Sequence, residues 1–447
     1  MEAADGNMGK IINLEEYNDL LKNVDRFIIK GKLTKAVGLI LETKHPLLSI
    51  GKICKIQSKN SVRREPVLAE VIGFNNDKAI LMPYGDISGI SLESEVVLLD
   101  EEEKFPVGNE LLGRILDPFG NPLDDRGKIY CKDFAKIFNE PPPPLERKRI
   151  QEVMDVGVRS INSFLTICKG QRIGIFAGSG VGKSTLLGMI TKYSGADINV
   201  VALIGERGRE VKEFVEKNLG EEGLKKSIVI VATSDKSPLI RLRGAFAATA
   251  IAEYFRDKGL DVLFLMDSIT RFAMASREIG LSAGEPPTVR GYTPSVFSVL
   301  PKLLERAANS DKGSITGIYT ILVEGDDMNE PISDTARSIL DGHIALSRKI
   351  AENGVFPAID MLNSISRVMP DVVSESHLLK AREVLKVVSE YRINEDLINI
   401  GAYSKGANEK IDFAIDHMEK IENYIRQTPN EKYSFEDSLE GLSTLLD

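Results

Sequence analysis

The pattern of apolar and polar positions divides the 447-residue chain into four parts. Apolar residues at helical spacing predict an amphipathic helix within residues 1–30. Short alternating runs between Gly, Pro, Asn and Asp clusters then predict a small β-barrel over 31–98. Apolar runs that alternate with longer amphipathic stretches predict a mostly parallel, helix-covered sheet over 99–369. Residues 370–447 show helical spacing throughout and predict a C-terminal helical domain.

Individual strands can be predicted in the two middle parts. In the barrel they are 36–41, 68–74 and 79–82. In the larger domain they are 198–204, 228–232, 262–266, 315–323 and 343–346.

The predicted N-terminal helix carries a single apolar stripe, formed by Leu14, Tyr17, Leu21, Val24 and Ile28. Such a stripe either packs on the rest of its own chain or docks on a partner helix or a membrane surface. The sequence favours neither alternative over the other.

Composition narrows the class of protein. Hydrophobic residues make up 43% and charged residues 28% of the chain, which is the balance of a soluble globular protein. No run approaches the roughly eighteen apolar residues of a membrane helix, and the start shows no signal-peptide pattern, so we expect a cytoplasmic protein. The net charge of −9 argues against nucleic acid as an obligate ligand. The cysteines are scattered singly, which excludes a metal cluster by spacing.

The strongest chemical signal is AGSGVGKST at 177–185, between a strand-like run and a helix-like segment. It matches the phosphate-binding pattern G-x-x-x-x-G-K-S/T, with Ala177 in place of the first glycine. Its backbone N–H groups and the following helix N-terminus would hold phosphate oxygens. Lys183 would reach the β- and γ-phosphates, and Ser184 would bind Mg²⁺. The predicted nucleotide contacts are Gly178, Ser179, Gly180, Val181, Gly182, Lys183, Ser184 and Thr185.

Two acidic residues would complete the chemistry. Asp267 ends an apolar strand, as a Walker B carboxylate that holds Mg²⁺ does. The next residue is Ser268, so the carboxylate that positions water must come from elsewhere, and Glu206 at the end of another strand is the candidate. Arg207 beside it would neutralise phosphate charge. Without the phosphate loop, a solvated charge cluster would be the better interpretation of Glu206 and Arg207.

Two features that the sequence lacks indicate which nucleotide is bound and which reaction follows. No N-K-x-D element is present, so a guanine-specific GTPase is disfavoured and ATP is the better candidate. No site for a hydroxyl-bearing acceptor is evident, which favours hydrolysis over phosphate transfer to a small molecule.

Longer motifs resemble the rotary-ATPase family and, within it, the flagellum-specific ATPases of type III protein export. Besides AGSGVGKST they are GERGREV, FLMDSITRFAMASREIGLSAGEPP, RGYTPSVFSVLPKLLERA, LVEGDDMNEPISD, LDGHIALSR and PAIDMLNSIS. The last resembles the family signature P-A-x-D-x-x-x-S-x-S, and the likeness covers 31–447. The resemblance implies an α/β P-loop core of the RecA-like type between a small β-barrel and a C-terminal helical domain.

The resemblance also implies an activity and an assembly. It implies a homohexamer that hydrolyses ATP with Mg²⁺ and energises or prepares unfolded proteins for flagellar export. The nucleotide sites would lie between subunits, and the barrels would form a crown. Implied partners are a stator-type regulatory protein at residues 1–30, a central-stalk protein at the C-terminal helices, export-gate membrane proteins, and export substrates with their chaperones. The implied place is the inner face of the cytoplasmic membrane.

Further site residues are implied by the resemblance alone. Glu206 and Asp267 keep the roles given above. Arg367 matches an arginine finger that reaches the neighbouring subunit's γ-phosphate, with a structural salt bridge as the alternative. Phe356 replaces the aromatic residue that stacks on adenine, with ordinary core as the alternative, and Gln427 would line the purine side. The loop 280–294 would face a central channel.

Three other functions compete with this interpretation. The injectisome ATPase of a secretion apparatus shares every catalytic motif, and Thr293 only leans toward the flagellar branch. A catalytic subunit of ATP synthase is disfavoured by Ala177 and by the lack of an acidic C-terminal motif. A noncatalytic nucleotide-binding ring subunit is disfavoured because Glu206 and Lys183 occur together.

Overall fold

The computed structural model describes residues 29–58, 65–99, 103–323 and 327–447. The chain divides into two compact units, Met1–Asp100 and Glu101–Asp447. The predicted N-terminal helix lies outside the described residues.

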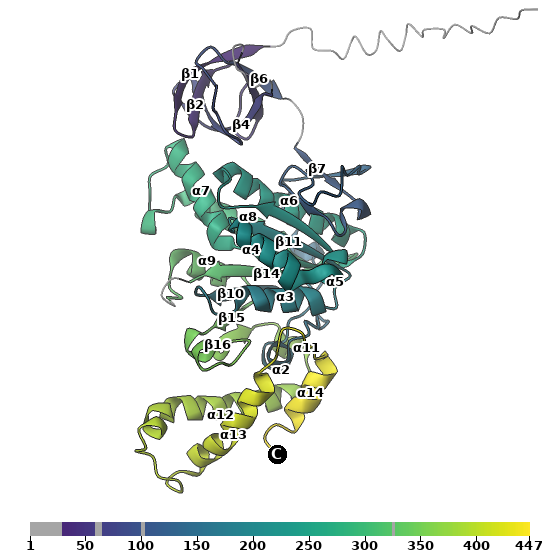
Figure 1. The fold of residues 1–447 in the computed structure, drawn as a ribbon, viewed down its shortest axis with the longest axis vertical. Coiled ribbons are helices and arrows are strands. Elements are labelled where there is room, and N and C mark those ends of the chain that lie inside the picture. The colour runs from purple at the N-terminus through teal and green to yellow at the C-terminus, as the bar shows by residue number, and fades with distance from the viewer. Residues whose placement is uncertain (1–28, 59–64, 100–102, 324–326) are drawn as a thin grey trace, which may run out of the picture. The chain divides into compact units, whose positions relative to one another are not determined.

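The first unit contains a closed barrel of antiparallel strands in the order β1-β2-β5-β4-β3-β6 (Figure 1). Leu33, Leu41, Ile56, Val71 and Leu81 are among the side chains that fill it. The predicted barrel is therefore confirmed. The strands are β1 (Lys30–Val37), β2 (Ile40–Lys44), β3 (Ile53–Gln57), β4 (Val67–Asn75), β5 (Lys78–Pro83) and β6 (Glu95–Leu99).

One predicted barrel strand is wrong. The run 36–41 spans the turn between β1 and β2, where Gly38 has a φ of 57°. Glycine adopts this left-handed conformation readily, so the chain reverses within the apolar run. The predicted runs 68–74 and 79–82 lie within β4 and β5.

The second unit is built on an eight-stranded sheet in the order β16-β15-β10-β14-β13-β11-β12-β8. Neighbouring strands are parallel except for β15 and β16, which are antiparallel. The five predicted strands correspond to β11 through β15, with ends that differ by at most one residue. The strands are β8 (Ile115–Leu116), β10 (Arg172–Ala177), β11 (Ile198–Ile204), β12 (Ser227–Ala232), β13 (Asp261–Asp267), β14 (Ser314–Leu322), β15 (Gly342–Leu346) and β16 (Ile359–Ser366). Two short strands, β7 (Lys104–Val107) and β9 (Asp133–Lys136), form a separate ribbon.

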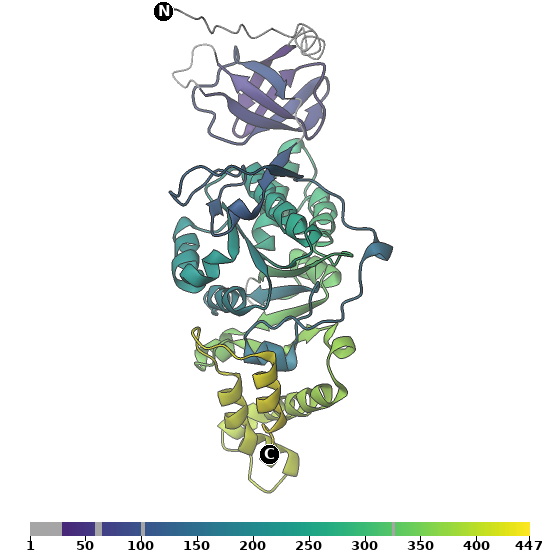
Figure 2. The ribbon, with the colours of Figure 1, turned by 90° about the vertical axis from the view of Figure 1, so that its right-hand side faces the viewer.

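Helices cover both faces of the sheet (Figures 1 and 2). One face packs against α6 (Pro238–Asp257), α7 (Ile269–Ala283), α8 (Pro294–Leu304) and α9 (Pro331–Ile339). The other packs against α3 (Lys183–Tyr193) and the segment Phe214–Leu219. Shorter helices connect these elements: α2 (Arg159–Phe164), α4 (Gly208–Glu213), α5 (Gly220–Lys225), α10 (Arg348–Glu352) and α11 (Met369–Val372). The mostly parallel, helix-covered architecture is as predicted.

The C-terminal part is helical, as predicted. It contains α12 (Glu375–Asn399), α13 (Glu409–Ile425) and α14 (Phe435–Ser443), with N-caps at Ser374, Asn408 and Ser434. Their apolar side chains join the cluster that also covers the α3 face of the sheet, so they belong to the same compact unit. Among the residues that the structure describes, no helix combines the length and the apolar composition needed to cross a bilayer.

Candidate active site

The glycine-rich loop connects β10, which ends at Ala177, to α3, which begins at Lys183. Gly180 and Gly182 have φ angles of 80° and 90°, in the left-handed region that favours glycine. Gly178, the first glycine of the loop, lies outside that region. A Cβ at Gly180 would meet no atom within 4 Å, so the loop leaves space beside its backbone. The loop therefore has the form of an anion cradle at a helix N-terminus.

Lys183 brings the two predicted carboxylates together. Its Nζ lies 2.6 Å from Oδ1 of Asp267 and 3.9 Å from Oε1 of Glu206. Asp267 ends β13, and Glu206 follows β11 after Gly205. β11 is not adjacent to β10, because β13 and β14 lie between them. The carboxyl ends of parallel strands share one sheet edge, which is why these residues still meet.

Burial makes Glu206 unusual for a glutamate. Glu206 is 9% exposed, and its Oε1 has no hydrogen-bond partner. Desolvation, followed by the negative charge of Asp267 and the hydrogen bond with Glu210, raises the pKa of Glu206 to about 8, although Lys183 opposes the rise. For Lys183, burial disfavours the positive charge, but Asp267 and Glu206 outweigh it and raise the pKa of the ammonium group. The Glu206 carboxyl group thus loses its proton at a higher pH than an ordinary glutamate does.

The arrangement fits a magnesium-bound nucleoside triphosphate. The unpartnered Oε1 of Glu206 can accept a hydrogen bond from a water molecule. Ser184 is exposed at the start of α3, and hydroxyl and carboxylate oxygens are the ligands that Mg²⁺ prefers. Ser184 and Asp267 would hold the ion, which would supply positive charge to the phosphate oxygens.

The two predicted arginines lie outside the cluster formed by Lys183, Glu206 and Asp267. Arg207 is at the border of the cluster, with a side chain 77% exposed and 3.7 Å from Glu210. Arg367 follows β16, where its backbone N–H donates to Asp341 and its Nη2 donates to the carbonyl of Arg337 at 3.2 Å. The structure does not place either guanidinium beside Lys183.

Arg367 and the phosphate loop lie at opposite ends of the strands of one sheet: Arg367 lies where β15 begins, and the loop lies where the parallel β10 ends. β16 runs antiparallel to β15, and Ser366 pairs with Gly342 at the start of β15. The phosphate loop instead follows the end of β10, which is parallel to β15. A six-residue strand spans about 20 Å, so Arg367 cannot reach a phosphate held by its own Lys183.

Comparisons with known proteins cover most of the chain and agree with one another. The family model described as "ATP synthase alpha/beta family, nucleotide-binding domain" matches residues 157–366, and that family's β-barrel domain matches 34–99. The model described as "T3SS EscN ATPase C-terminal domain" matches 373–444. The flagellum-specific ATP synthase of Bacillus subtilis is 52% identical over 96% of this chain and 97% of its own length.

The chain belongs to the ATP synthase alpha/beta family. The predicted resemblance to rotary ATPases of type III export is therefore confirmed, as is the predicted fold class.

Two further relatives of this family member come from secretion systems. The type 3 secretion system ATPase of Xanthomonas euvesicatoria is 45% identical over 93% of this chain and 94% of its own length. The assembled ATPase EscN from enteropathogenic E. coli is 46% identical, with a TM-score of 0.88 over 93% of this chain and all of that chain. EscN in complex with its central stalk EscO is 45% identical, with a TM-score of 0.85 and the same coverage.

The two adenine residues predicted in this family member differ in environment. Phe356 is 43% exposed, and its ring would lie 3.5 Å from a Cβ at Gly182, so it borders the phosphate loop. Gln427 is 2% exposed. Its side chain accepts from the backbone N–H of Arg159 and donates to the carbonyls of Gly157 and Glu431.

Gln427 is nevertheless linked to the loop. Its backbone N–H donates to the carbonyl of Phe356 at 2.8 Å. The contacts therefore favour a role in positioning Phe356, because the amide group of Gln427 is already bonded within the chain. Direct contact of Gln427 with a purine stays a prediction.

Sequence patterns missed several polar neighbours of the site. Thr320 on β14 donates its hydroxyl to Asp267 at 2.6 Å and holds the carboxylate in place. Arg348 donates to the carbonyl of Ser179 at 3.4 Å, and both line a cavity of about 570 Å³ with Arg271, whose Nε is buried and unpartnered. The sequence around Thr320 gives no sign of a functional role, because threonine is common in buried strands. Arg271 and Arg348 each follow a predicted strand, and this pattern could have identified them as candidates for phosphate binding.

Proposed function

We propose that this chain is a Mg²⁺-dependent ATPase that works as a homohexamer and energises or prepares unfolded proteins for flagellar type III export. One observation carries the proposal: Lys183, Glu206 and Asp267 lie at one edge of the sheet, and Arg367 lies at the other. A ring of copies allows the arginine of one subunit to complete the site of the next. The structure of the assembled relative EscN supports assembly of several copies.

Each group then has a chemical task. The loop amides and Lys183 bind the phosphates, and Asp267 with Ser184 holds Mg²⁺. Glu206 accepts a hydrogen bond from the attacking water and orients it toward the γ-phosphorus. Arg367 of the neighbouring subunit stabilises the negative charge on the γ-phosphate oxygens in the transition state. Phe356 offers an exposed aromatic ring near the loop for the adenine.

The identities of relatives do not separate the flagellar branch from the injectisome. The flagellum-specific relatives of Bacillus subtilis and Borreliella burgdorferi are 52% and 45% identical, and the Xanthomonas euvesicatoria secretion ATPase is 45% identical. The fold does not separate the branches, because EscN from a secretion system shares it.

Deletion of the gene in its source organism tests this function. We expect flagellar filament subunits to remain inside the cell, and export to return with the parent gene but not with Glu206→Gln. The substituted protein should accumulate to the parent level, which an immunoblot would check. Normal filaments in the deletion strain, with loss of secreted effector proteins, would instead establish the injectisome function.

The C-terminal helices offer a surface for the proposed central stalk. Ile393 and Leu397 are 76% and 48% exposed on one face near the end of α12, and Ile400, the residue directly after the helix, is 75% exposed; these three residues form an exposed apolar stripe. Three exposed apolar side chains in a row are typical of a contact with a partner helix. EscN is a relative whose structure contains a central stalk, EscO.

We expect Ile393→Ser combined with Ile400→Ser to weaken stalk binding about tenfold or more, since truncating an apolar anchor costs over about 1 kcal/mol. Leu379→Ser is the matched control, because Leu379 is 53% exposed on the same helix but outside the stripe. Calorimetric titration with the stalk protein measures both. Equal affinities of the double variant and the control would remove the stripe from the interface.

The remaining partners rest on the resemblance. The stator-type protein at residues 1–30, the export-gate proteins, the substrates and chaperones, and the place beside the cytoplasmic membrane all stay predictions. Binding of the stator protein by a chain that lacks residues 1–30 would contradict the first of them.

A further inference from the structure

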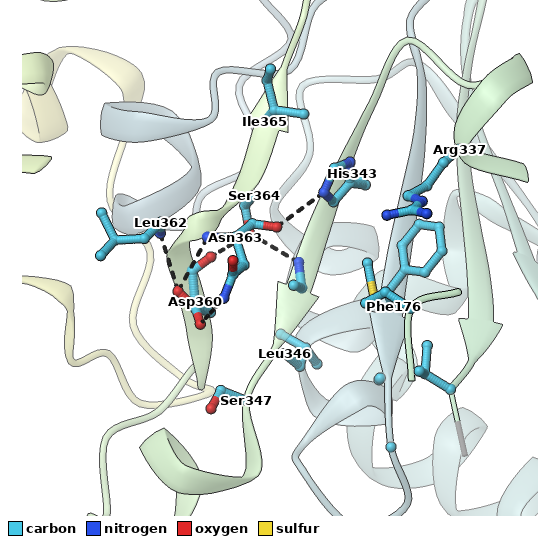
Figure 3. Close-up of a pocket in the computed structure, with 15 residues that line it drawn as sticks. Phe176, Arg337, His343, Leu346, Ser347, Asp360, Leu362, Asn363, Ser364 and Ile365 are labelled. Atoms are coloured by element: carbon cyan, nitrogen blue, oxygen red, sulfur yellow. Dashed lines mark hydrogen bonds between the residues drawn. The ribbon is translucent and has the colours of Figure 1, made fainter. Parts of the chain in front are cut away.

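Strand β16, which leads to Arg367, contains a long bulge. Asp360 pairs with Ala345 and Ile365 pairs with His343, so residues 361–364 lie opposite the single residue Ile344. Figure 3 shows this segment beside a cavity of about 630 Å³. A bulge of this size has no regular ladder bonds of its own and must be shaped by side chains.

Asp360 shapes the bulge. Its carboxylate accepts from the backbone N–H groups of Leu362 and Asn363 at 3.1 and 3.3 Å, and from the side chain of Asn363 at 2.8 Å (Figure 3). Its carbonyl accepts from the hydroxyl of Ser364, which in turn accepts from the backbone N–H of Ala345. The conformation of residues 361–364 therefore depends on where the Asp360 carboxylate is held.

The fourth partner of that carboxylate comes from the C-terminal helices. Nη1 of Arg392 on α12 donates to both oxygens of Asp360, at 2.8 and 3.1 Å. The Asp360 side chain is 10% exposed, so its charge has little solvent to replace this partner. Arg392 directly precedes Ile393, the first residue of the exposed apolar stripe. A displacement of this end of α12 would thus also move the guanidinium that holds Asp360.

Two observations bear on how far the position of Arg367 depends on Arg392. Ser366 and Arg367 have anchors of their own, since the Ser366 hydroxyl donates to the carbonyl of Thr166 and the Arg367 N–H donates to Asp341. Loss of Arg392 would therefore displace Arg367 partly rather than release it. Conversely, a cavity of about 210 Å³ lies at the same joint, so apolar packing alone does not fix α12 against β16 there.

We propose that Arg392 is a positioning residue for hydrolysis: by holding Asp360 it sets the bulge of β16 and thereby the place of Arg367. The inference rests on the proposed function, in which Arg367 completes the neighbouring site. It connects the stalk-facing end of α12 to the charge that stabilises the transition state. Stalk contact would then change turnover through this ion pair.

Arg392→Gln tests the proposal, with Lys349→Gln as the matched control. Lys349 on α10 forms a 2.6 Å ion pair with Glu395, so it also joins α12 to the sheet domain, but this ion pair does not involve β16. We expect Arg392→Gln to lower kcat about 10- to 100-fold, since a misplacement of about 1 Å can cost that much. The KM for ATP should change less than about twofold, because the finger acts in the transition state. Arg392→Lys should recover part of kcat, and Lys349→Gln should match the parent.

Mixing with a second variant separates positioning from local damage. Lys183→Ala has a dead site but a sound Arg367, so after subunit exchange it should restore activity to the intact loops of Arg392→Gln subunits. Mixing Arg392→Gln with Arg367→Ala should restore nothing, because neither supplies a sound finger. A kcat of Arg392→Gln equal to that of the parent would overturn the proposal.

The same mixtures distinguish the positioning role of Arg392 from the proposed site shared between subunits. If Arg367→Ala recovers with Lys183→Ala while Arg392→Gln does not, the positioning role is wrong and the shared site stands. If neither pair recovers although mass measurement shows exchange, the shared site fails, and the role of Arg392 fails with it.

Discussion

Glu206→Gln is expected to abolish ATP hydrolysis and leave nucleotide binding close to that of the parent. Glutamine keeps the shape of the side chain but removes the carboxylate charge at Oε1, the buried atom without a hydrogen-bond partner that would orient the water. Positioned general bases contribute about 10²- to 10⁴-fold to rate, so activity should fall by at least about 10². Phosphate release and calorimetric titration with ATP measure the two quantities separately.

Lys183→Ala provides the contrasting variant. It removes the ammonium group that lies 2.6 Å from Asp267 and would bind the β- and γ-phosphates, so both affinity and hydrolysis should be lost. Removal of Mg²⁺ with EDTA should stop the parent in the same assay, and added Mg²⁺ should restore it. Hydrolysis by Glu206→Gln at the parent rate would show that another group positions the water.

The pH profile gives a second test of Glu206. Its pKa is raised to about 8, mainly by burial, so the free protein holds this carboxyl mostly protonated below that pH. Only the ionised form can accept the proton of water, and kcat/KM reports ionisations of the free protein. We therefore expect kcat/KM to rise with pH up to about pH 8, and the residual activity of Glu206→Gln to lack this rise.

Arg367→Ala is expected to lower hydrolysis about 10³- to 10⁵-fold, the range known for arginine fingers in other phosphoryl-transfer proteins. ATP affinity should persist, because the loop of the same chain is intact and lies at the other edge of the sheet. Specific activity of the parent should rise with protein concentration as rings form. Full activity of Arg367→Ala at every concentration would show that this arginine is not the finger.

The part of the site that one chain supplies could be predicted from the sequence, because its residues occur in local patterns of strand, loop and helix. A phosphate loop lies between a strand and a helix, and Glu206 and Asp267 follow apolar strands whose ends share one edge of a parallel sheet. Strand order was not accessible in this way. The strands β13 and β14 lie between the loop strand β10 and β11, which precedes Glu206, and Oε1 of Glu206 still lies 3.9 Å from Nζ of Lys183.

Contacts between distant segments explain most of what the sequence could not predict. The amide of Gln427 bonds to Arg159 and Gly157, more than 260 residues away, so no local pattern could show that it is occupied. Thr320 and Asp267 likewise meet only because β14 and β13 are neighbours. The run 36–41 resembled a strand until the conformation of Gly38 showed a turn. Arg367 was identified through the family resemblance alone, and the antiparallel β16 supplies a physical reason to propose that it acts in trans.

The most direct test of the shared site mixes two inactive variants. Lys183→Ala lacks a working phosphate loop but carries a sound Arg367, and Arg367→Ala has the opposite defect. After subunit exchange, verified by mass measurement, some interfaces join an intact loop to an intact arginine, and we expect ATP hydrolysis to appear. A fully exchanged mixture that stays as inactive as its two components would contradict a site completed by Arg367 of the neighbouring subunit.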